Sequence, residues 1–305
     1  MQLSAEQRQE IAKQAKQELA RRNYYDYVAY THGHIFSYTR HGEFICNKVN
    51  AMIERKERMR AGLEPVRNQY MILSVPPRHG KSMHVTETVA SYYLGKFPDD
   101  RVIMGAYNEN YASKFGRKNR QKVAAVGDEL FEIQLARDSA SVTDWNIEGK
   151  RGGVISRGIM SGVTGEGADL MVLDDPIKNR EEANSEVYRN KLWDEWIDSL
   201  STRLHPGAIV IIIMTRWHED DLVGRLLKEE YGNVLDWDVI NLPLECDEKH
   251  INEEGNPLGR EIGQPLWPES YGDDFIDERK SYPQSFNSLF QGRPTAQEGN
   301  MLKRD

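Results

Sequence analysis

The sequence predicts an α/β protein with a mostly parallel central sheet flanked by helices. Between Gln69 and about Leu242, short apolar segments alternate with longer segments of helical character, and this alternation indicates βαβ units. Several short segments are apolar throughout, as expected of strands that are covered on both faces. The strand candidates are 70–75, 101–107, 153–156, 169–173, 208–214 and 236–242, and the helices between them are 82–94, 109–126, 184–200 and 219–231.

Helical segments precede this alternating region, and a more polar segment follows it. Residues 4–30 place Ile11, Ala15 and Leu19 at four-residue spacing, and a second helical stretch runs from about 42 to 60. After Pro243 the chain is rich in glycine and proline to about Pro268, and helical character returns at 273–282. We therefore expect an N-terminal helical segment (1–65), a core (66–242) and a small C-terminal subdomain (243–305).

The composition is that of a globular protein. The chain has 305 residues, 39% hydrophobic and 29% charged, which is enough for one large or two small domains. It contains no apolar run of membrane-spanning length and begins without an apolar signal core. Cys46 and Cys246 form no metal-binding or disulfide pattern, which suggests a reducing cytoplasm. With a net charge of −8, a nucleic acid would have to be met by a local basic patch.

Residues 75–82, Val-Pro-Pro-Arg-His-Gly-Lys-Ser, match a phosphate-binding loop whose usual first glycine is Val75. The loop lies between a predicted strand and a predicted helix, where backbone amides and the helix dipole favour a polyanion. Proline has no N–H, so the amides must come from the five residues that follow, Arg78, His79, Gly80, Lys81 and Ser82. Lys81 is predicted to reach the β- and γ-phosphates of ATP, and the Ser82 hydroxyl to ligate Mg²⁺. The alternative is an ordinary proline-rich turn with a lysine at a helix start.

A second element follows the apolar run Leu170–Leu173, which ends in Asp174-Asp175-Pro176. Open α/β sheets bind ligands at the carboxyl ends of their strands, where these carboxylates would lie. Asp174 is then the Walker B carboxylate of the Mg²⁺ shell, and Asp175 stands where a water-activating acid is expected. The same residues also make a good turn, which is the alternative. Together with Gly80-Lys81-Ser82, they predict a site for ATP and Mg²⁺.

The third element is the strongest strand candidate, Ile209–Met214, which continues into Thr215-Arg216-Trp217-His218. A polar residue at the end of the strand beside Walker B can sense the γ-phosphate, and Thr215 is the best-placed candidate. The alternative is a helix cap with a tryptophan packed beneath it.

The order of these motifs resembles the large terminase subunit of tailed bacteriophages, the ATPase that packages DNA into proheads. The resemblance spans roughly 70–300. Its segments are 76–82, Thr-Gly-Glu-Gly-Ala-Asp with Leu-Met-Val-Leu-Asp-Asp-Pro (164–176), Thr-Arg-Trp-His-Glu-Asp-Asp-Leu (215–222), Gly259-Arg260, Pro265–Glu269 and Phe-Gln-Gly-Arg-Pro (290–294). The combination is far more specific than any one motif.

This resemblance implies a RecA-like P-loop ATPase core of the additional-strand, conserved-glutamate (ASCE) type, with a small C-terminal lid. It also implies a C-terminal nuclease domain. This chain stops near the expected start of that domain, so we expect no nuclease activity from this chain. The implied partners are double-stranded DNA, the portal protein, the small terminase subunit and further copies of the chain in a ring on the prohead, in the host cytoplasm and away from membranes. A monomer in solution is left open.

Three departures from the family pattern concern catalysis. The usual catalytic glutamate is Asp175 here, so either Asp175 acts itself or Glu181 or Glu182 takes its place. Where an arginine often stands, this chain has Glu166. An arginine finger would then come from Arg157, supplied by a neighbouring subunit, and the alternative for Arg157 is a solvated loop arginine. The third departure is Arg78 inside the phosphate loop, where it would contact the γ-phosphate within its own chain or bridge to a carboxylate of the lid.

Two further predictions concern DNA and adenine. Residues 114–122 carry basic and no acidic side chains, and Lys114, Arg117 and Lys118 are neighbours on a helix. The predicted phosphate contacts are Arg117, Lys118, Arg120 and Lys122, and the alternative is a solvated helix face. The resemblance also suggests that residues 36–41 contact adenine, through Tyr38, Arg40 or His41, and the alternative for any one aromatic here is ordinary core packing.

Other functions remain open. One is a different DNA-stimulated P-loop ATPase, such as a helicase-like motor, although a single set of motifs argues against a second lobe. The other is a nucleotide-regulated capsid-assembly module with little turnover, which the missing first glycine and Asp175 keep open.

Overall fold

The computed structural model describes residues 4–137, 141–162, 165–228, 230 and 235–295. Its strands form one sheet in the order β3-β4-β2-β5-β6-β1-β7, parallel throughout except for the antiparallel β3–β4 pair. The strands are β1 (Gln69–Ser74), β2 (Arg101–Ala106), β3 (Asp144–Asn146), β4 (Gly153–Gly158), β5 (Ala168–Asp174), β6 (Leu204–Ile213) and β7 (Trp237–Asn241). All six predicted strands are present, and the short edge strand β3 is the one that the sequence did not predict.

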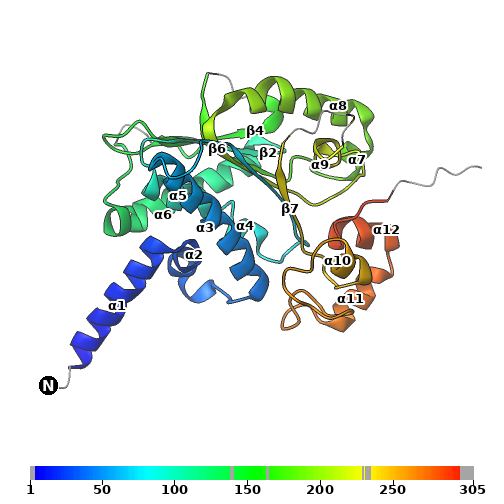
Figure 1. Cartoon of the computed structure of the whole chain (residues 1–305), viewed down its shortest axis with the longest axis horizontal. Helices are drawn as coiled ribbons and strands as arrows, with labels where there is room; N and C mark the ends of the chain where they lie inside the picture. The colour runs from blue at the N-terminus through cyan, green and yellow to red at the C-terminus, as the bar shows by residue number, and fades with distance from the viewer. Residues whose placement is uncertain (1–3, 138–140, 163–164, 229, 231–234, 296–305) are drawn as a thin grey trace, which may run out of the picture.

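Helices cover both faces of the sheet (Figure 1). On one face lie α2 (Tyr24–His32), α3 (Arg40–Arg60), α4 (Lys81–His84), α5 (Val89–Lys96) and α6 (Glu109–Phe131), and on the other α7 (Arg180–Asn184), α8 (Glu186–Asp194) and α9 (Leu222–Leu226). A π-helical segment, Glu195–Leu200, continues α8. The C-terminal helices α10 (Glu248–Asn252), α11 (Asp273–Lys280) and α12 (Pro283–Ser285) gather beyond β7, while α1 (Ala5–Arg22) projects from the opposite side. None of the described helices could span a membrane.

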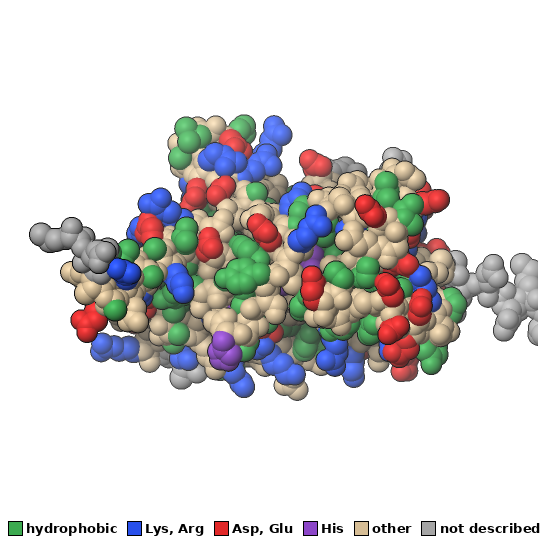
Figure 2. Space-filling view, turned by 90° about the horizontal axis from the view of Figure 1, so that it is seen from below, with side chains coloured by type: hydrophobic (Ala, Val, Ile, Leu, Met, Phe, Trp, Pro, Cys, Tyr) green, Lys and Arg blue, Asp and Glu red, His purple; other side chains and the backbone are tan. Residues whose placement is uncertain are grey.

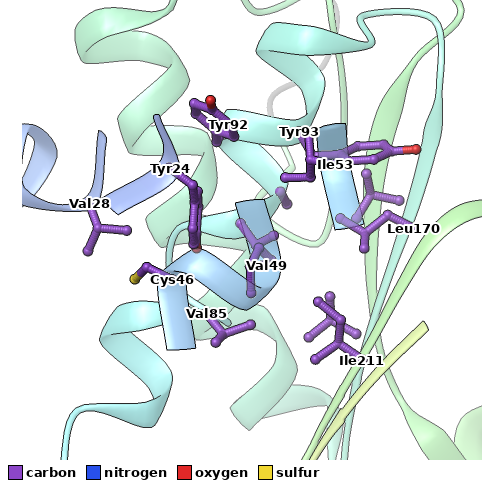
Figure 3. Close-up of a cluster of buried hydrophobic side chains, with 14 of the residues drawn as sticks. Tyr24, Val28, Cys46, Val49, Ile53, Val85, Tyr92, Tyr93, Leu170 and Ile211 are labelled. Carbon is purple, nitrogen blue, oxygen red and sulfur yellow. The ribbon is translucent and has the colours of Figure 1, made fainter. Parts of the chain in front are cut away.

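The strands are apolar on both sides because each face has its own core. Leu73, Leu170 and Ile211 face α2, α3 and α5, where Tyr24, Val49 and Tyr92 pack (Figure 3). Their chain neighbours Ile72 and Ile212 face the opposite core, which is closed by Trp196 and Leu192. Alternation along a strand sends successive side chains to opposite faces, so a buried parallel sheet needs continuous apolar runs. The α/β fold predicted from those runs is confirmed.

Three predicted helices differ from the structure. Residues 4–30 form two helices, because the Asn23 side chain accepts hydrogen bonds from Tyr25 N and Asp26 N and starts α2 anew. The predicted stripe on α1 is not buried: Ile11 is 51% and Leu19 53% exposed. The helix predicted over 82–94 is interrupted at residues 85–88. Within 219–231 the helix covers Leu222–Leu226, and residues 229 and 231 lie outside the described residues.

The predicted C-terminal subdomain has its own small apolar cluster, Leu244, Ile276 and Phe286. The Phe-Gln-Gly-Arg motif ties it to the sheet. Asn241, the last residue of β7, donates to Gln291 O at 2.9 Å. Within the subdomain, Gln291 pairs with both backbone groups of Glu245, and Arg293 forms ion pairs with Asp247 and Glu254. Gly292 has a φ of 68° and lies so close to Asn241 that a Cβ would clash with its Oδ1. The motif therefore stabilises the attachment of this subdomain.

Candidate nucleotide-binding site

Three of the sequence motifs meet at the carboxyl edge of the sheet. The strands β5, β6 and β1 are adjacent, so the segments that follow them lie side by side. Lys81 Nζ lies 2.6 Å from Asp175 Oδ2 and 3.2 Å from Thr215 Oγ1. The ammonium group of Lys81 is thus the point where three segments meet: the predicted phosphate loop, the residues after β5 and the residue after β6.

The phosphate loop has the backbone conformation of an anion-binding turn. Arg78 has a φ of 64° and Gly80 a φ of 80°. Left-handed residues in such a turn direct successive amides toward one concave side. At Gly80 glycine is required twice over, since a Cβ there would lie 2.7 Å from the His84 ring. Arg78 is exposed, and its carbonyl accepts a 3.5 Å hydrogen bond from Tyr271 Oη.

The side chain of His79 points away from any phosphate. It is fully buried and packs on the Tyr271 ring of the C-terminal subdomain, with 4.5 Å between ring centroids. The His79 carbonyl accepts a 3.1 Å hydrogen bond from His41 Nε2. Burial lowers the pKa of His79 to about 4 and of His41 to about 3, so both rings are neutral near pH 7. Any contact of His79 with nucleotide must come from its backbone.

Asp174, the predicted metal-side carboxylate, is enclosed beside the loop. It is fully buried, and its Oδ2 accepts hydrogen bonds from Thr86 Oγ1 at 2.7 Å and Ser82 Oγ at 3.4 Å. Burial raises the pKa of Asp174 to about 6, although the positive charge of Lys81 opposes this shift. Its Oδ1 atom is buried without a hydrogen-bond partner among the described residues. A buried carboxylate oxygen with spare capacity favours a cation.

The donor set fits Mg²⁺ shared with a nucleotide. Mg²⁺ prefers oxygen ligands and is commonly held by one or two protein groups together with substrate phosphates. Ser82 and Asp174 supply such oxygens. No cluster of three or more His, Cys, Asp or Glu suited to a metal occurs in the described part of the chain. The residues therefore fit a metal that arrives with its nucleotide.

Asp175 has a strained backbone that its neighbours hold in place. Its φ is 44°, which is unfavourable for a residue with a side chain. Its N–H donates to Ile213 O at 2.8 Å, and its Oδ1 accepts from Thr215 N at 2.9 Å. The structure thus brings Asp175 to Lys81. Neither alternative is brought there among the described contacts: Glu182 accepts a hydrogen bond from Lys178 N at the start of α7, and Glu181 is exposed beside it.

The arginine candidates occupy different places. Arg157 lies at the end of β4, with β2 between it and β5, and its Nη1 is 3.9 Å from Glu109 Oε1. Glu166, which stands where an arginine was expected, forms a 3.1 Å ion pair with Arg101 at the start of β2. That is the amino edge of the sheet, opposite the phosphate loop. The structure leaves Arg78 and Arg157, both at the carboxyl edge, as candidates.

Within the described residues, Thr215 is the one member of the 215–222 motif that contacts Lys81. Arg216 Nε lies 3.0 and 2.8 Å from the two carboxylate oxygens of the fully buried Asp221, and Asp221 caps α9. Arg189 and Arg225 both bind Asp220. The remainder of the motif is therefore a scaffold that fixes the end of β6.

A cavity of about 310 Å³ lies beside the loop, between α3 and the C-terminal subdomain. Tyr38, Arg40 and His41, the predicted adenine-side residues, line one wall, and Trp267 lines another. Arg40 Nη2 donates to Leu258 O at 2.5 Å, which links the two walls. Trp267 and Tyr271 were not predicted as site residues, although the Pro265–Glu269 segment was a signal. A larger open depression of about 800 Å³ lies near β3 and contains none of the residues predicted for the site.

On α6, the four predicted DNA contacts divide into pairs. Arg117 and Lys118 are exposed, whereas Arg120 and Lys122 are partly buried. Lys122 Nζ donates to Glu87 O at 2.9 Å, and burial lowers its pKa to about 8. Lys118 forms a 2.5 Å ion pair with Glu87. The basic face that a phosphate could reach is therefore narrower than the sequence predicted, and Lys114, which is exposed, belongs to it.

The fold and the site define a RecA-like P-loop protein. A family model described as "Terminase large subunit, T4likevirus-type, N-terminal" matches residues 72–305, and the chain belongs to this family. No curated protein matches the chain significantly.

The chain is similar to the crystal structure of the HK97 bacteriophage large terminase, with 12% identity and a TM-score of 0.52 over 85% of this chain and 51% of that one. It thus spans about half the length of that protein. The Thermus phage P74-26 large terminase ATPase domain matches with 16% identity and a TM-score of 0.44, over 76% of this chain and 90% of that one. An arginine-to-alanine mutant of that domain matches with 16% identity and a TM-score of 0.43, over 78% of this chain and 93% of that one.

Proposed function

We propose that this chain is an ATP-hydrolysing motor domain that moves double-stranded DNA into a prohead. The observation that carries the proposal is the convergence of Lys81, Asp175 and Thr215 beside the phosphate loop, in a chain of the large terminase family. The portal protein, the small terminase subunit and a ring of identical chains are the partners that membership implies, in the host cytoplasm.

The residues divide the work of phosphoryl transfer to water. The loop amides and Lys81 bind the β- and γ-phosphates, and Lys81 must leave Asp175 to do so because a polyanion competes for its charge. Ser82 and Asp174 would hold Mg²⁺, which when bound neutralises phosphate charge. Asp175, released from Lys81, orients the attacking water and accepts its proton, while ADP leaves with the electron pair of the broken bond. Thr215 reports the γ-phosphate state to the end of β6.

Turnover of ATP by the purified chain tests the site. Lys81→Ala and Asp174→Ala are each expected to abolish hydrolysis, while Lys96→Ala, at the end of α5 where Lys96 pairs with Glu57 at 3.3 Å, leaves it unchanged. The assay is run with and without duplex DNA. Undiminished turnover in either site variant would remove the assigned site. Turnover near zero in the wild type, with ATP bound, would favour the assembly module, and strand separation would favour a helicase-like motor.

DNA binding is proposed for the exposed basic face of α6. Figure 2 shows acidic side chains gathered at the right of that view, over the C-terminal subdomain. Neutralising the exposed Lys114, Arg117 and Lys118 together should weaken binding of duplexes of any sequence. Each lost phosphate contact flattens the slope of log affinity against log salt by about 0.9. An unchanged slope would place the DNA surface elsewhere.

A mixing experiment separates the two arginines. If Arg157 acts on a neighbour's nucleotide, an Arg157→Ala chain and a Lys81→Ala chain, each inactive alone, regain activity together. Intact Arg157 of one subunit then faces an intact phosphate loop of the next. If Arg78 acts within its own chain, specific activity is independent of concentration and mixing restores nothing under conditions where rings form.

A further inference from the structure

The helix that follows the phosphate loop is interrupted between α4 and α5, at residues 85–88, here called the break. Glu87 N donates to Ser82 O at 2.8 Å, one residue beyond α-helical spacing. Val85, with φ −126° and ψ −76°, has left the helical region. The sequence favours a continuous helix here, and a local departure of this kind beside a site is often functional.

The inner side of the break contacts the proposed metal-side carboxylate. The Thr86 hydroxyl, which is fully buried, donates to Asp174 Oδ2 at 2.7 Å. The Ser82 hydroxyl lies farther from the same oxygen, at 3.4 Å. Asp174 Oδ2 is thus shared by both hydroxyls, and it lies closer to Thr86 in the break than to Ser82, the other proposed Mg²⁺ group.

The outer side of the break is bound to the basic helix. Asn119, fully buried in α6, donates to Thr86 O at 2.8 Å and accepts from Ser91 N at 2.9 Å. Lys118 Nζ holds the Glu87 carboxylate at 2.5 Å, yet the Lys118 side chain is still 47% exposed. A phosphate from solution can therefore reach Lys118 while it is paired.

We propose that the break couples DNA on α6 to Asp174. A backbone phosphate that binds Lys118 displaces the Glu87 carboxylate, because both anions compete for one ammonium group. The break is then held to α6 only by the hydrogen bonds from Asn119 to Thr86 O and from Lys122 to Glu87 O. With the ion pair lost, the break shifts, the Thr86 hydroxyl moves away from Asp174, and the carboxylate moves closer to Ser82. The inference rests on the proposed function, since it takes Asp174 as the metal-side carboxylate. Glu87 and Thr86 are positioning residues, which act through Lys118 and Asp174.

Neutralising Glu87 should imitate bound DNA. In Glu87→Gln the rate without DNA rises to the DNA-stimulated rate, so the stimulation ratio falls to unity. Binding of a mixed-sequence duplex tightens by about two- to fivefold, as expected when a partly exposed ion pair no longer competes. Glu57→Gln removes the same charge from a lysine pair unconnected to the break and should keep the wild-type ratio. A wild-type ratio in Glu87→Gln overturns the coupling.

Two further variants keep the test decisive should Glu87→Gln fold poorly. Lys118→Gln breaks the same pair from the exposed side, so it should raise the rate without DNA while weakening duplex binding. At the inner side, Thr86→Ser retains the hydroxyl and the stimulation ratio, whereas Thr86→Val loses the ratio. Stimulation that survives Thr86→Val overturns the proposal.

Hydrogen exchange of the nucleotide-free protein supplies a readout that is independent of turnover. Saturating duplex should accelerate exchange of the Glu87 and Thr88 amides, which donate to Ser82 O and Val85 O. In Glu87→Gln these amides should exchange fast without DNA. If the wild type hydrolyses no ATP, the proposed function fails, and unchanged exchange on DNA binding separately overturns the coupling.

Discussion

The central sheet has a lysine–aspartate cluster at each end of its strands, and the two clusters are built differently. At the amino edge, Lys56 Nζ lies 3.6 Å from both Asp100 Oδ2 and Asp169 Oδ1 and donates to Gly207 O at 3.0 Å. At the carboxyl edge, Lys81 contacts Asp175 and Thr215 beside Asp174. The first is here called the amino-edge cluster and the second the carboxyl-edge cluster.

The amino-edge cluster is saturated with partners. Asp100 accepts hydrogen bonds from Tyr93 Oη at 2.6 Å and Arg60 Nη2 at 2.5 Å. Burial opposes ionisation of Asp169, but a hydrogen bond from Arg101 N and the charge of Lys56 hold its pKa below the usual value. Asp169 is thus stabilised in its charged form, and each carboxylate of the cluster has partners, as buried charges require.

The carboxyl-edge cluster leaves capacity unused. Asp174 Oδ1 has no hydrogen-bond partner among the described residues, the pKa of Asp174 is raised, and Asp175 and Arg78 have strained backbones. Hydrogen-bond acceptors without partners and strained backbone both lower the stability of a fold. Such features are typical of sites that a bound ligand completes. The comparison teaches that the same residue types stabilise the fold at one edge and remain available for chemistry at the other.

The largest expected contrast comes from one substitution made at both edges. Asp175→Asn should reduce ATP turnover by about 10²–10⁴-fold, since it removes a proton acceptor. Asp169→Asn should leave turnover per folded molecule unchanged, because Asp169 lies at the other end of the sheet. Steady-state rates measured on folded protein decide this. Near-normal turnover in Asp175→Asn would return the role to Glu181 or Glu182.

Lysine removal should reverse the contrast in stability. Lys56→Met leaves Asp100 and Asp169 buried without their shared cation, which should lower the free energy of unfolding by about 3–5 kcal/mol. Lys81→Met should cost less than about 1 kcal/mol, because Asp175 is partly solvated and keeps its bond from Thr215 N. Urea denaturation compares them. Equal losses would mean that both clusters are structural.

Acid should affect the two ends of the sheet in separate pH windows. His41 and His79, beside the phosphate loop, have folded pKa values of about 3 and 4 against about 6.5 unfolded. The unfolded chain therefore binds protons first, and stability falls as pH drops below about 6.5, by up to about 1.4 kcal/mol per pH unit per histidine. Asp169 has a lowered pKa, so its contribution persists above its unfolded value and is lost only at lower pH.

Denaturation at several pH values, with His41→Gln as the variant, measures this. Between about pH 6 and 5, the free energy of unfolding should change less steeply with pH in the variant, by up to about 1.4 kcal/mol per pH unit, which corresponds to one proton. An unchanged pH dependence would show that folding does not lower the pKa of His41.

The smallest effect concerns backbone strain. Arg78→Gly should raise the free energy of unfolding by up to about 1 kcal/mol, because glycine adopts the φ of 64° without steric cost. At the amino edge, Arg60→Gly lies within α3 and should destabilise. Thermal melts measure both, and ATP turnover measured alongside shows whether the strained Arg78 contributes to catalysis. A destabilised Arg78→Gly would mean that the side chain contributes more than the strain costs.

Much of the fold followed from local patterns. The six longer strands were predicted because buried parallel strands are continuous apolar runs, and the three-residue β3 has no such run. The motif residues of the carboxyl-edge cluster were found because each motif is contiguous in the chain. The bend at Asn23 and the break at 85–88 were missed because capping and tertiary hydrogen bonds overrode helical spacing.

The sequence by itself determined the α/β class, the phosphate loop and the carboxylates after β5, since each depends on neighbours within a few residues. Only the tertiary structure decided which charges are paired. It brought Lys56 to Asp100 and Asp169, turned the His79 ring toward Tyr271, and tied Lys122 to the Glu87 carbonyl. The physical reason is that a side chain's partners and burial depend on segments far away in the chain, whose meeting is set by the packing of the whole sheet.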